Sequence, residues 1–132
     1  MNAVSIDISQ FLHDNGFGVI NDDLFAMEWR EGKDAQTLII DTSGRDSDQP
    51  VTYENPYFQI LVRGAKNDDV NASYTVLKAI HDFIIEQDQN TIVINGDDYL
   101  GITPIGTLTP LGRDDNDRFV WSMNYFTFRN GT

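Results

Sequence analysis

The stretch from Asp68 to Gln87 constrains the fold of this chain more than any other part of the sequence. Its apolar residues recur every three or four positions, the period of one helix face, and no glycine or proline interrupts them. Asn67, Asp68 and Asp69 supply caps and negative charge where the helix begins. We therefore predict a long helix that packs across a β-sheet. Its apolar face consists of Val70, Tyr74, Leu77, Ile80, Phe83 and Ile84.

Alternating apolar and polar residues predict β-strands on both sides of this helix. The clearest run spans residues 56–63, where Phe58, Ile60 and Val62 share one face of a strand. Such alternation is typical of a sheet with one face against the core. The other expected strands span residues 24–29, 37–41, 91–95, 99–111 and 118–128.

A shorter helix is expected near the N-terminus. Ile8, Phe11 and Leu12 form an apolar stripe at helical spacing. Asp7 is the predicted N-cap of this helix, and Gly16 is its predicted stop. The chain thus begins with a helix, and three expected strands separate that helix from the long one.

These elements predict an α+β fold in a single domain over residues 1–132. The sheet is expected to be mostly antiparallel and packed against one long and one short helix, which cover one face. Residues 24–29 and 37–41 are expected to pair as an antiparallel hairpin. Trp29 and Trp121 alternate with other apolar residues of their strands, which predicts that both lie in the core.

Polar segments and prolines interrupt the expected strands. Residues 42–55, TSGRDSDQPVTYEN, form a connection longer than the roughly 4–6 residues typical of compact domains. Loops of this size are often functional. An acidic turn at residues 112–117 precedes the last strand. Pro104 and Pro110 limit the run at 99–111 to edge or broken pairing.

The charge of the chain excludes several classes of partner. Nine Lys and Arg residues stand against 21 Asp and Glu residues, for a net charge of −12. A sequence-independent nucleic-acid binder needs a basic footprint, and docking on an anionic membrane surface needs basic segments. We therefore expect neither activity. The 40% hydrophobic content is nonetheless sufficient for a packed core.

The sequence contains no recognisable catalytic or cofactor motif. There are no cysteines, which excludes disulfides, thiolate metal sites and a cysteine nucleophile. His13 and His81 are the only histidines, and neither a G-x-S-x-G elbow nor a phosphate-binding glycine loop is present. The acidic run at 114–117 fails the calcium-loop register because Arg118 occupies its fifth position. We expect no catalytic residues, no metal and no cofactor.

Three stretches of the sequence form a familiar pattern: FLHDNGFGVINDDLFAMEWRE, IIDTSGRDSDQPVTYENPYFQILVRGA and TPIGTLTPLGRDDNDRFVWSMNYFTFR. Their order resembles small minor capsid proteins of tailed bacteriophages, the group of tail terminators or tail-to-head joining proteins. The resemblance spans nearly the whole chain and implies a tail-terminator-like fold. The resemblance implies that a set of positions maintains the fold and the geometry of the ring. These positions are Asp41–Gly44, Pro56, Arg63-Gly64, Leu111–Asp114 and Arg118.

The resemblance implies a structural protein of the virion, located in the neck or tail and assembled in the host cytoplasm. It implies a homo-oligomeric ring, usually a hexamer, which caps the head-proximal end of the tail tube, stops tube growth and joins the tail to the head. The implied partners are the tail tube protein and the head connector or neck protein. An acidic ring wall would repel the phosphate backbone, so DNA is expected to pass through the lumen without specific binding.

Mixed-charge loops are the candidates for subunit or partner contacts. A ring needs two different, complementary patches on each subunit, and charged contacts set register and orientation. The candidate contact residues are Arg45, Asp46, Asp48, Arg113, Asp114, Asp115 and Arg118.

Two alternative functions remain open from the sequence. Another phage neck or head-closure protein would share this size and composition. An acidic inhibitor that mimics DNA would need carboxylates at phosphate-like spacing on one face, whereas the acids of this chain are scattered among turns.

Overall fold

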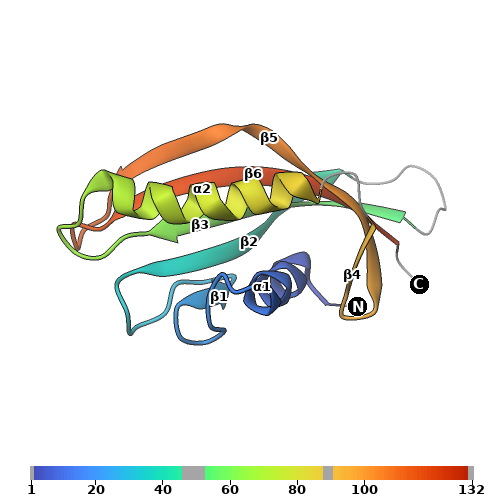
Figure 1. The fold of residues 1–132 in the computed structure, drawn as a ribbon, viewed down its shortest axis with the longest axis horizontal. Helices are drawn as coiled ribbons and strands as arrows, with labels where there is room; N and C mark the ends of the chain where they lie inside the picture. Colours follow the sequence, from blue (N-terminus) through green and yellow to red (C-terminus); the bar gives the residue numbers. More distant parts are fainter. Residues whose placement is uncertain (1, 46–52, 88–90, 131–132) are drawn as a thin grey trace.

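The computed structural model describes residues 2–45, 53–87 and 91–130, which form a six-stranded sheet and two helices (Figure 1). The predicted α+β class is confirmed. The strands lie side by side in the order β1-β2-β3-β6-β5-β4. The elements are α1 (Val4–Asp14), β1 (Leu24–Ala26), β2 (Gln36–Arg45), β3 (Tyr53–Arg63), α2 (Val70–Glu86), β4 (Thr91–Ile94), β5 (Asp97–Arg113) and β6 (Phe119–Asn130).

The sheet is mostly antiparallel, as predicted, with one exception at its margin. β1 runs parallel to β2, so the predicted antiparallel hairpin between residues 24–29 and 37–41 is wrong. Met27 has a φ of 76° directly after β1, and this left-handed conformation turns the chain out of the sheet. Residues 27–35 then carry the chain back to the end where β1 began, and β2 therefore starts in the same direction.

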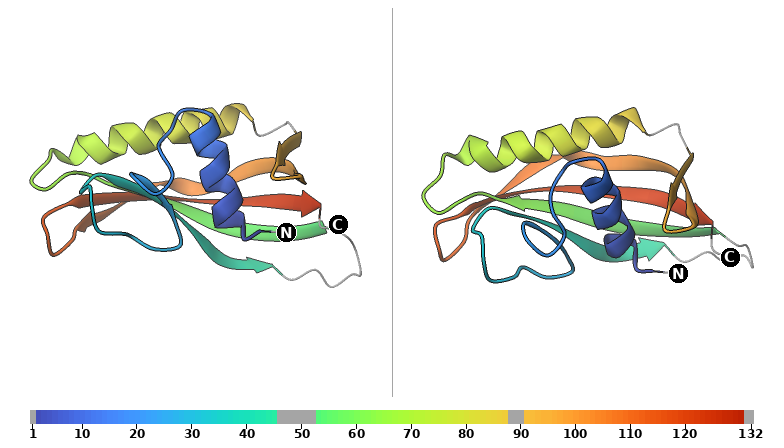
Figure 2. Two further views of the ribbon diagram at one scale, coloured as in Figure 1. Left: turned by 90° about the horizontal axis from the view of Figure 1, so that it is seen from below. Right: turned by 60° about the horizontal axis from the view of Figure 1, so that its bottom comes forward.

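Both helices pack on the same face of the sheet (Figure 2). α1 contacts β1, β2, β3 and β4, and α2 contacts β3, β5 and β6. The apolar stripes predicted for the two helices and for the strand at 56–63 meet in one core, except that Val70, at the start of α2, is exposed. Its fully buried residues include Ile8, Leu12, Phe58, Ile60, Leu77, Ile80, Ile84 and Tyr125.

The two helices begin in different ways. At α2, Asp69 is the N-cap, and its side chain accepts a hydrogen bond of 2.8 Å from the backbone N–H of Asn71. At α1, Ala3 occupies the N-cap position, so the prediction of Asp7 as N-cap is wrong. Asp7 lies in the first turn and is fully buried. Gly16, with a φ of 84°, follows the end of α1 as predicted.

The connection predicted at residues 42–55 is shorter than the sequence indicates. β2 continues to Arg45, and β3 begins at Tyr53. Residues 46–52 lie outside the part of the chain that the structure describes. Polar residues therefore extend these two strands beyond the apolar segments that predicted them.

β5 is one long strand with irregular pairing, which agrees with the interruption predicted from Pro104 and Pro110. Its register against β6 shifts at three places. Gly101, Gly106 and Gly112 have positive φ angles of 76°, 80° and 88°, a conformation that glycine adopts without steric cost. These glycines allow the strand to bulge and continue where a regular ladder is interrupted.

α2 buries a histidine against the sheet. His81 Nδ1 lies 2.8 Å from the hydroxyl oxygen of Tyr125 on β6. Burial lowers the pKa of His81 below its usual 6.5, the positive charge of Lys78 lowers it further, and Asp82 opposes the shift. The folded protein therefore binds fewer protons at this site than the unfolded chain does.

Acidification is expected to destabilise the protein through His81. Since the folded pKa is lowered, this contribution to the free energy of unfolding is present above pH 6.5 and is lost as the pH falls below that value. Thermal unfolding measured from about pH 7.5 to about pH 5 checks this, and a His81→Asn variant should show a shallower dependence. Equal slopes in the His81 variant and the wild type would contradict the prediction.

Candidate partner-contact site

Arg113, Asp114 and Arg118 come together at the turn between β5 and β6. The Asp114 carboxylate accepts hydrogen bonds from the backbone N–H groups of Asn116 (2.9 Å) and Arg118 (3.0 Å) and from Arg118 Nε (2.8 Å). Burial by itself raises the pKa of Asp114, but these hydrogen bonds and the Arg118 charge outweigh it and hold the pKa below its usual value. The charged side chains of the turn thus stabilise the turn itself.

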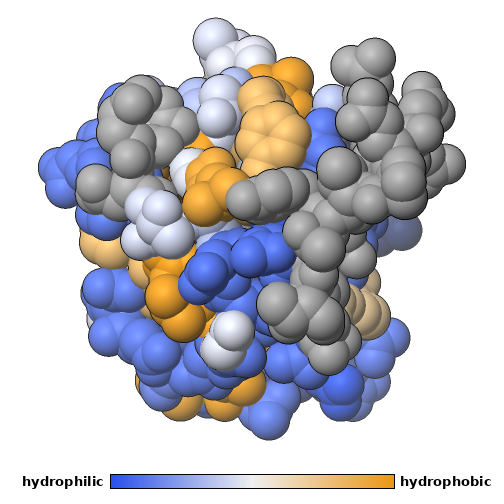
Figure 3. Space-filling model, turned by 90° about the vertical axis from the view of Figure 1, so that its right-hand side faces the viewer, coloured by the Kyte–Doolittle hydropathy of each residue, from blue (hydrophilic) through white to orange (hydrophobic). Residues whose placement is uncertain are grey.

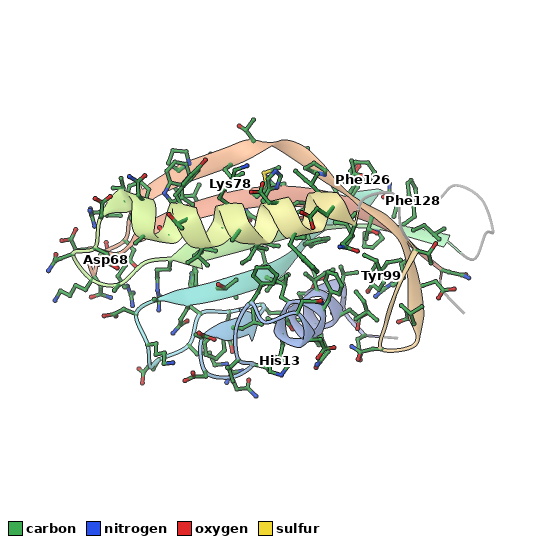
Figure 4. All side chains as sticks on the ribbon, in the orientation of Figure 1. His13, Asp68, Lys78, Tyr99, Phe126 and Phe128 are labelled. Atoms are coloured by element: carbon green, nitrogen blue, oxygen red, sulfur yellow. The ribbon has the colours of Figure 1, made fainter. Side chains whose placement is uncertain are left out.

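The same arginines tie the turn to two neighbouring loops. Arg113 Nη2 donates to the backbone oxygen of Asp68 at 3.0 Å, and Arg118 Nη1 lies 3.3 Å from Asp34 Oδ1. Asp68 marks this end of the molecule in Figure 4. We call this hydrogen-bonded unit, made of residues 31–35, 64–69 and 114–118, the loop end.

Asp115 differs from the other predicted contact residues of the turn. It is exposed, and it makes no hydrogen bond or ion pair with the described residues. Arg113, Asp114 and Arg118 are already engaged with groups of their own chain. Among the predicted contact residues of this turn, Asp115 is therefore the one whose carboxylate is exposed and not engaged by the described residues.

The other predicted contact residues belong to the far end of the sheet. Arg45 ends β2, with its backbone opposite Asn55 of β3. Asp46 and Asp48 lie outside the described residues. In Figure 1 this end of β2 is on the right, and the turn at 114–118 is on the left. The structure therefore does not bring the two predicted groups together.

Arg63, at the end of β3, fastens the loop end to the sheet. Its Nε donates to the backbone oxygen of Asp34 at 2.7 Å, and its guanidinium carbon lies 4.6 Å from the centre of the Trp29 ring. Burial and the nearby charge of Arg118 lower the pKa of Arg63. Trp29 is half-buried over this guanidinium and not in the core as predicted, because β1 ends before it. Trp121, in contrast, packs against the core.

A buried polar cluster lies near the other end of the sheet. Asp7 accepts hydrogen bonds from the Tyr99 hydroxyl and from Asn95 Nδ2 (2.7 Å), and Arg129 Nη1 lies 3.6 Å from its carboxylate. Burial and the hydrogen bond to Asp7 raise the pKa of Tyr99 far above its ordinary value. The cluster joins α1 to β5 and β6. Sequence reasoning missed it because Asp7 and Tyr99 are separated by 92 residues.

The described part of the chain offers no evident site for a metal ion. Within residues 2–45, 53–87 and 91–130, no three histidine or acidic side chains are grouped so that they could ligate one. Neither helix in this part has the length and apolar composition to cross a membrane.

Comparison with known proteins shows which family the chain resembles. A family model described as bacteriophage tail terminator protein matches residues 11–127. The chain belongs to the bacteriophage tail terminator family. As a tail terminator, it is a structural component of the virion tail or neck and interacts with other tail components. The resemblance inferred from the sequence is thereby confirmed.

Other comparisons bear on the fold of this tail terminator. No curated protein matches the chain. One solved structure aligns with a TM-score of 0.50 and 14% sequence identity, and the alignment covers 95% of this chain and 90% of that chain. At this identity the alignment indicates a shared fold alone.

Proposed function

We propose that the protein caps the head-proximal end of the phage tail tube, stops growth of the tube and joins the tail to the head. It does so as a homo-oligomeric ring, a hexamer, with the tail tube protein and the head connector or neck protein as partners. It assembles in the host cytoplasm and has no catalytic activity. Membership of the tail terminator family over residues 11–127 is the observation that carries this proposal.

The positions of the predicted contact residues support a joining role. A protein between tail and head needs separate surfaces for two partners. Asp115 and the loop end lie at one end of the sheet, and Arg45 lies at the other. Asp46 and Asp48 lie within three residues of Arg45 in the sequence. In the proposed arrangement each of these ends contacts a different partner, and Arg113, Asp114 and Arg118 hold Asp115 in place.

The acidic charge supports a passive role toward DNA. With a net charge of −12, the protein repels the phosphate backbone, so DNA passes through the proposed ring without specific binding. A ring structure with arginine and lysine side chains lining the lumen would contradict this part of the proposal.

The capping proposal is tested by assembling tail tubes with and without this protein. Electron microscopy is expected to show long tubes of variable length without the protein, and tubes that stop growing and carry a cap at one end when the protein is present. Tubes that grow to the same lengths at saturating protein concentration would contradict the proposed function.

Asp115→Ala is expected to weaken capping without loss of stability. An exposed ion pair contributes up to about 1 kcal/mol, so the concentration needed for half-maximal capping should rise by up to about fivefold. Tube length as a function of protein concentration measures this effect. Asp14→Ala removes an exposed carboxylate from the end of α1, next to His13, which Figure 4 places away from the loop end, and serves as the matched control. An equal effect of both variants would show that Asp115 makes no specific contact.

A further inference from the structure

The helix-free face of the sheet carries an exposed apolar strip near the β4–β5 hairpin. We call Tyr57, Val93, Leu100, Phe126 and Phe128 the apolar strip. Val93 is 65% exposed, and Leu100 and Phe128 are also exposed. The ring centres of Phe126 and Phe128 lie 6.1 Å apart, and those of Tyr57 and Phe126 lie 5.8 Å apart. Figure 4 shows both phenylalanines toward this end of β6, and Figure 3 shows apolar side chains exposed on the same end of the molecule.

A groove lies between α1 and β1, at the margin of the sheet that β1 forms. Its volume is about 330 Å³, and Ile6, Leu24, Phe25 and Met27 contribute apolar side chains to its lining. Met27 is 52% exposed, and Ile6 is exposed as well. β1 and β4 are the two marginal strands of the sheet. The groove borders β1, whereas the apolar strip runs from β4 across β5 and β6 to β3, so the two surfaces share no residue.

We infer that the apolar strip of one copy docks in the α1–β1 groove of the next copy. This inference rests on the proposed ring and names the surfaces that form it. Contacts between two unlike surfaces join subunits head to tail, and such a chain of contacts closes into a ring when the rotation allows it. The strip exposes apolar side chains and the groove has apolar side chains in its lining, so contact between them would remove apolar surface from water on both copies.

The charges beside the two surfaces favour a second copy as the occupant. Arg30 lines the groove, and Asp98 lies opposite Val93 in the β4–β5 ladder beside the strip. The Arg30 guanidinium is exposed, with Glu28 3.6 Å away. In a chain with a net charge of −12, association of identical copies needs apolar contact and opposite charges at the interface to offset their repulsion. The strip and the groove supply both.

Cysteine cross-linking tests which surfaces meet, because the chain contains no cysteine of its own. A Val93→Cys chain is mixed with a Met27→Cys chain under oxidising conditions, alone and in the presence of tail tubes. Disulfide-linked mixed dimers are expected. Val76→Cys, at an exposed position on α2, replaces Met27→Cys in the control and should give no mixed dimer. If Val93→Cys and Met27→Cys form no mixed dimer in either condition, the inference is overturned.

A second experiment tests whether the contact is head to tail. Val93→Glu damages the strip and leaves the groove intact, and Met27→Glu does the reverse. Each variant alone is expected to remain monomeric in analytical ultracentrifugation, whereas an equal mixture should form dimers through the one intact contact and nothing larger. Wild-type thermal unfolding of each variant confirms that the fold is retained.

The outcomes separate this inference from the proposed function. If the wild type caps tubes while both glutamate variants still form rings, the strip–groove contact is wrong and the capping role stands. If the wild type fails to cap tubes, the proposed function is wrong, and mixed cross-linking then reports a self-association unrelated to tail assembly.

Discussion

Replacing Asp7 by alanine is expected to lower the free energy of unfolding by about 3–5 kcal/mol. The Asp7 carboxylate is fully buried and accepts hydrogen bonds from Tyr99 and Asn95. Its removal also breaks the ion pair with the buried Arg129 guanidinium. Because Asp7 and Tyr99 are fully buried, the loss costs more than an exposed ion pair contributes. Urea unfolding followed by circular dichroism measures the change.

Two further variants distinguish the buried cluster from a general effect on α1. Asp14→Ala removes an exposed carboxylate from the same helix and should change stability by no more than about 0.5 kcal/mol. Tyr99→Phe removes one hydroxyl and keeps the Asp7–Arg129 pair, so its cost should lie between those of the two aspartate variants. If Asp7→Ala is as stable as Asp14→Ala, the cluster does not stabilise the fold.

Phe58→Ala is expected to cost about 3–5 kcal/mol, through lost burial and the cavity that remains. Phe58 is fully buried on the central strand β3, and its ring stacks on Tyr125 of β6 with 5.3 Å between centres. Both helices pack on this face of the sheet, so little room exists for neighbouring groups to close the cavity. The midpoint of urea unfolding should fall accordingly.

Phe128→Ala is the matched control for this prediction. Phe128 lies on the helix-free face and is exposed, so its truncation should change the free energy of unfolding by less than about 1 kcal/mol. A similar loss in both variants would mean that the core does not lie between the helices and the sheet.

The candidate contact site could be predicted from the sequence in part. Asp114 and Arg118 are four residues apart in one turn, so their proximity follows from local geometry. Their links to other loops do not. Asp34 lies 84 residues from Arg118, and Asp68 lies 45 residues from Arg113. The role of Asp115 as the accessible carboxylate emerges only after these long-range contacts have engaged the other charged residues of the turn.

The sequence predicted α2, β3 and β6, because helical and strand periodicities depend on residues close together in the chain. It also placed Phe58 and Leu77 in the core, since apolar residues at those periods must leave water together. Two features are visible only in the folded structure: β1 runs parallel to β2, and Asp7 is buried against Tyr99 instead of capping α1. The direction of β1 relative to β2 depends on the path that the chain takes after Met27. The burial of Asp7 depends on partners such as Tyr99, which lie far from it in the sequence and which folding brings to it. Local spacing carries no information about either.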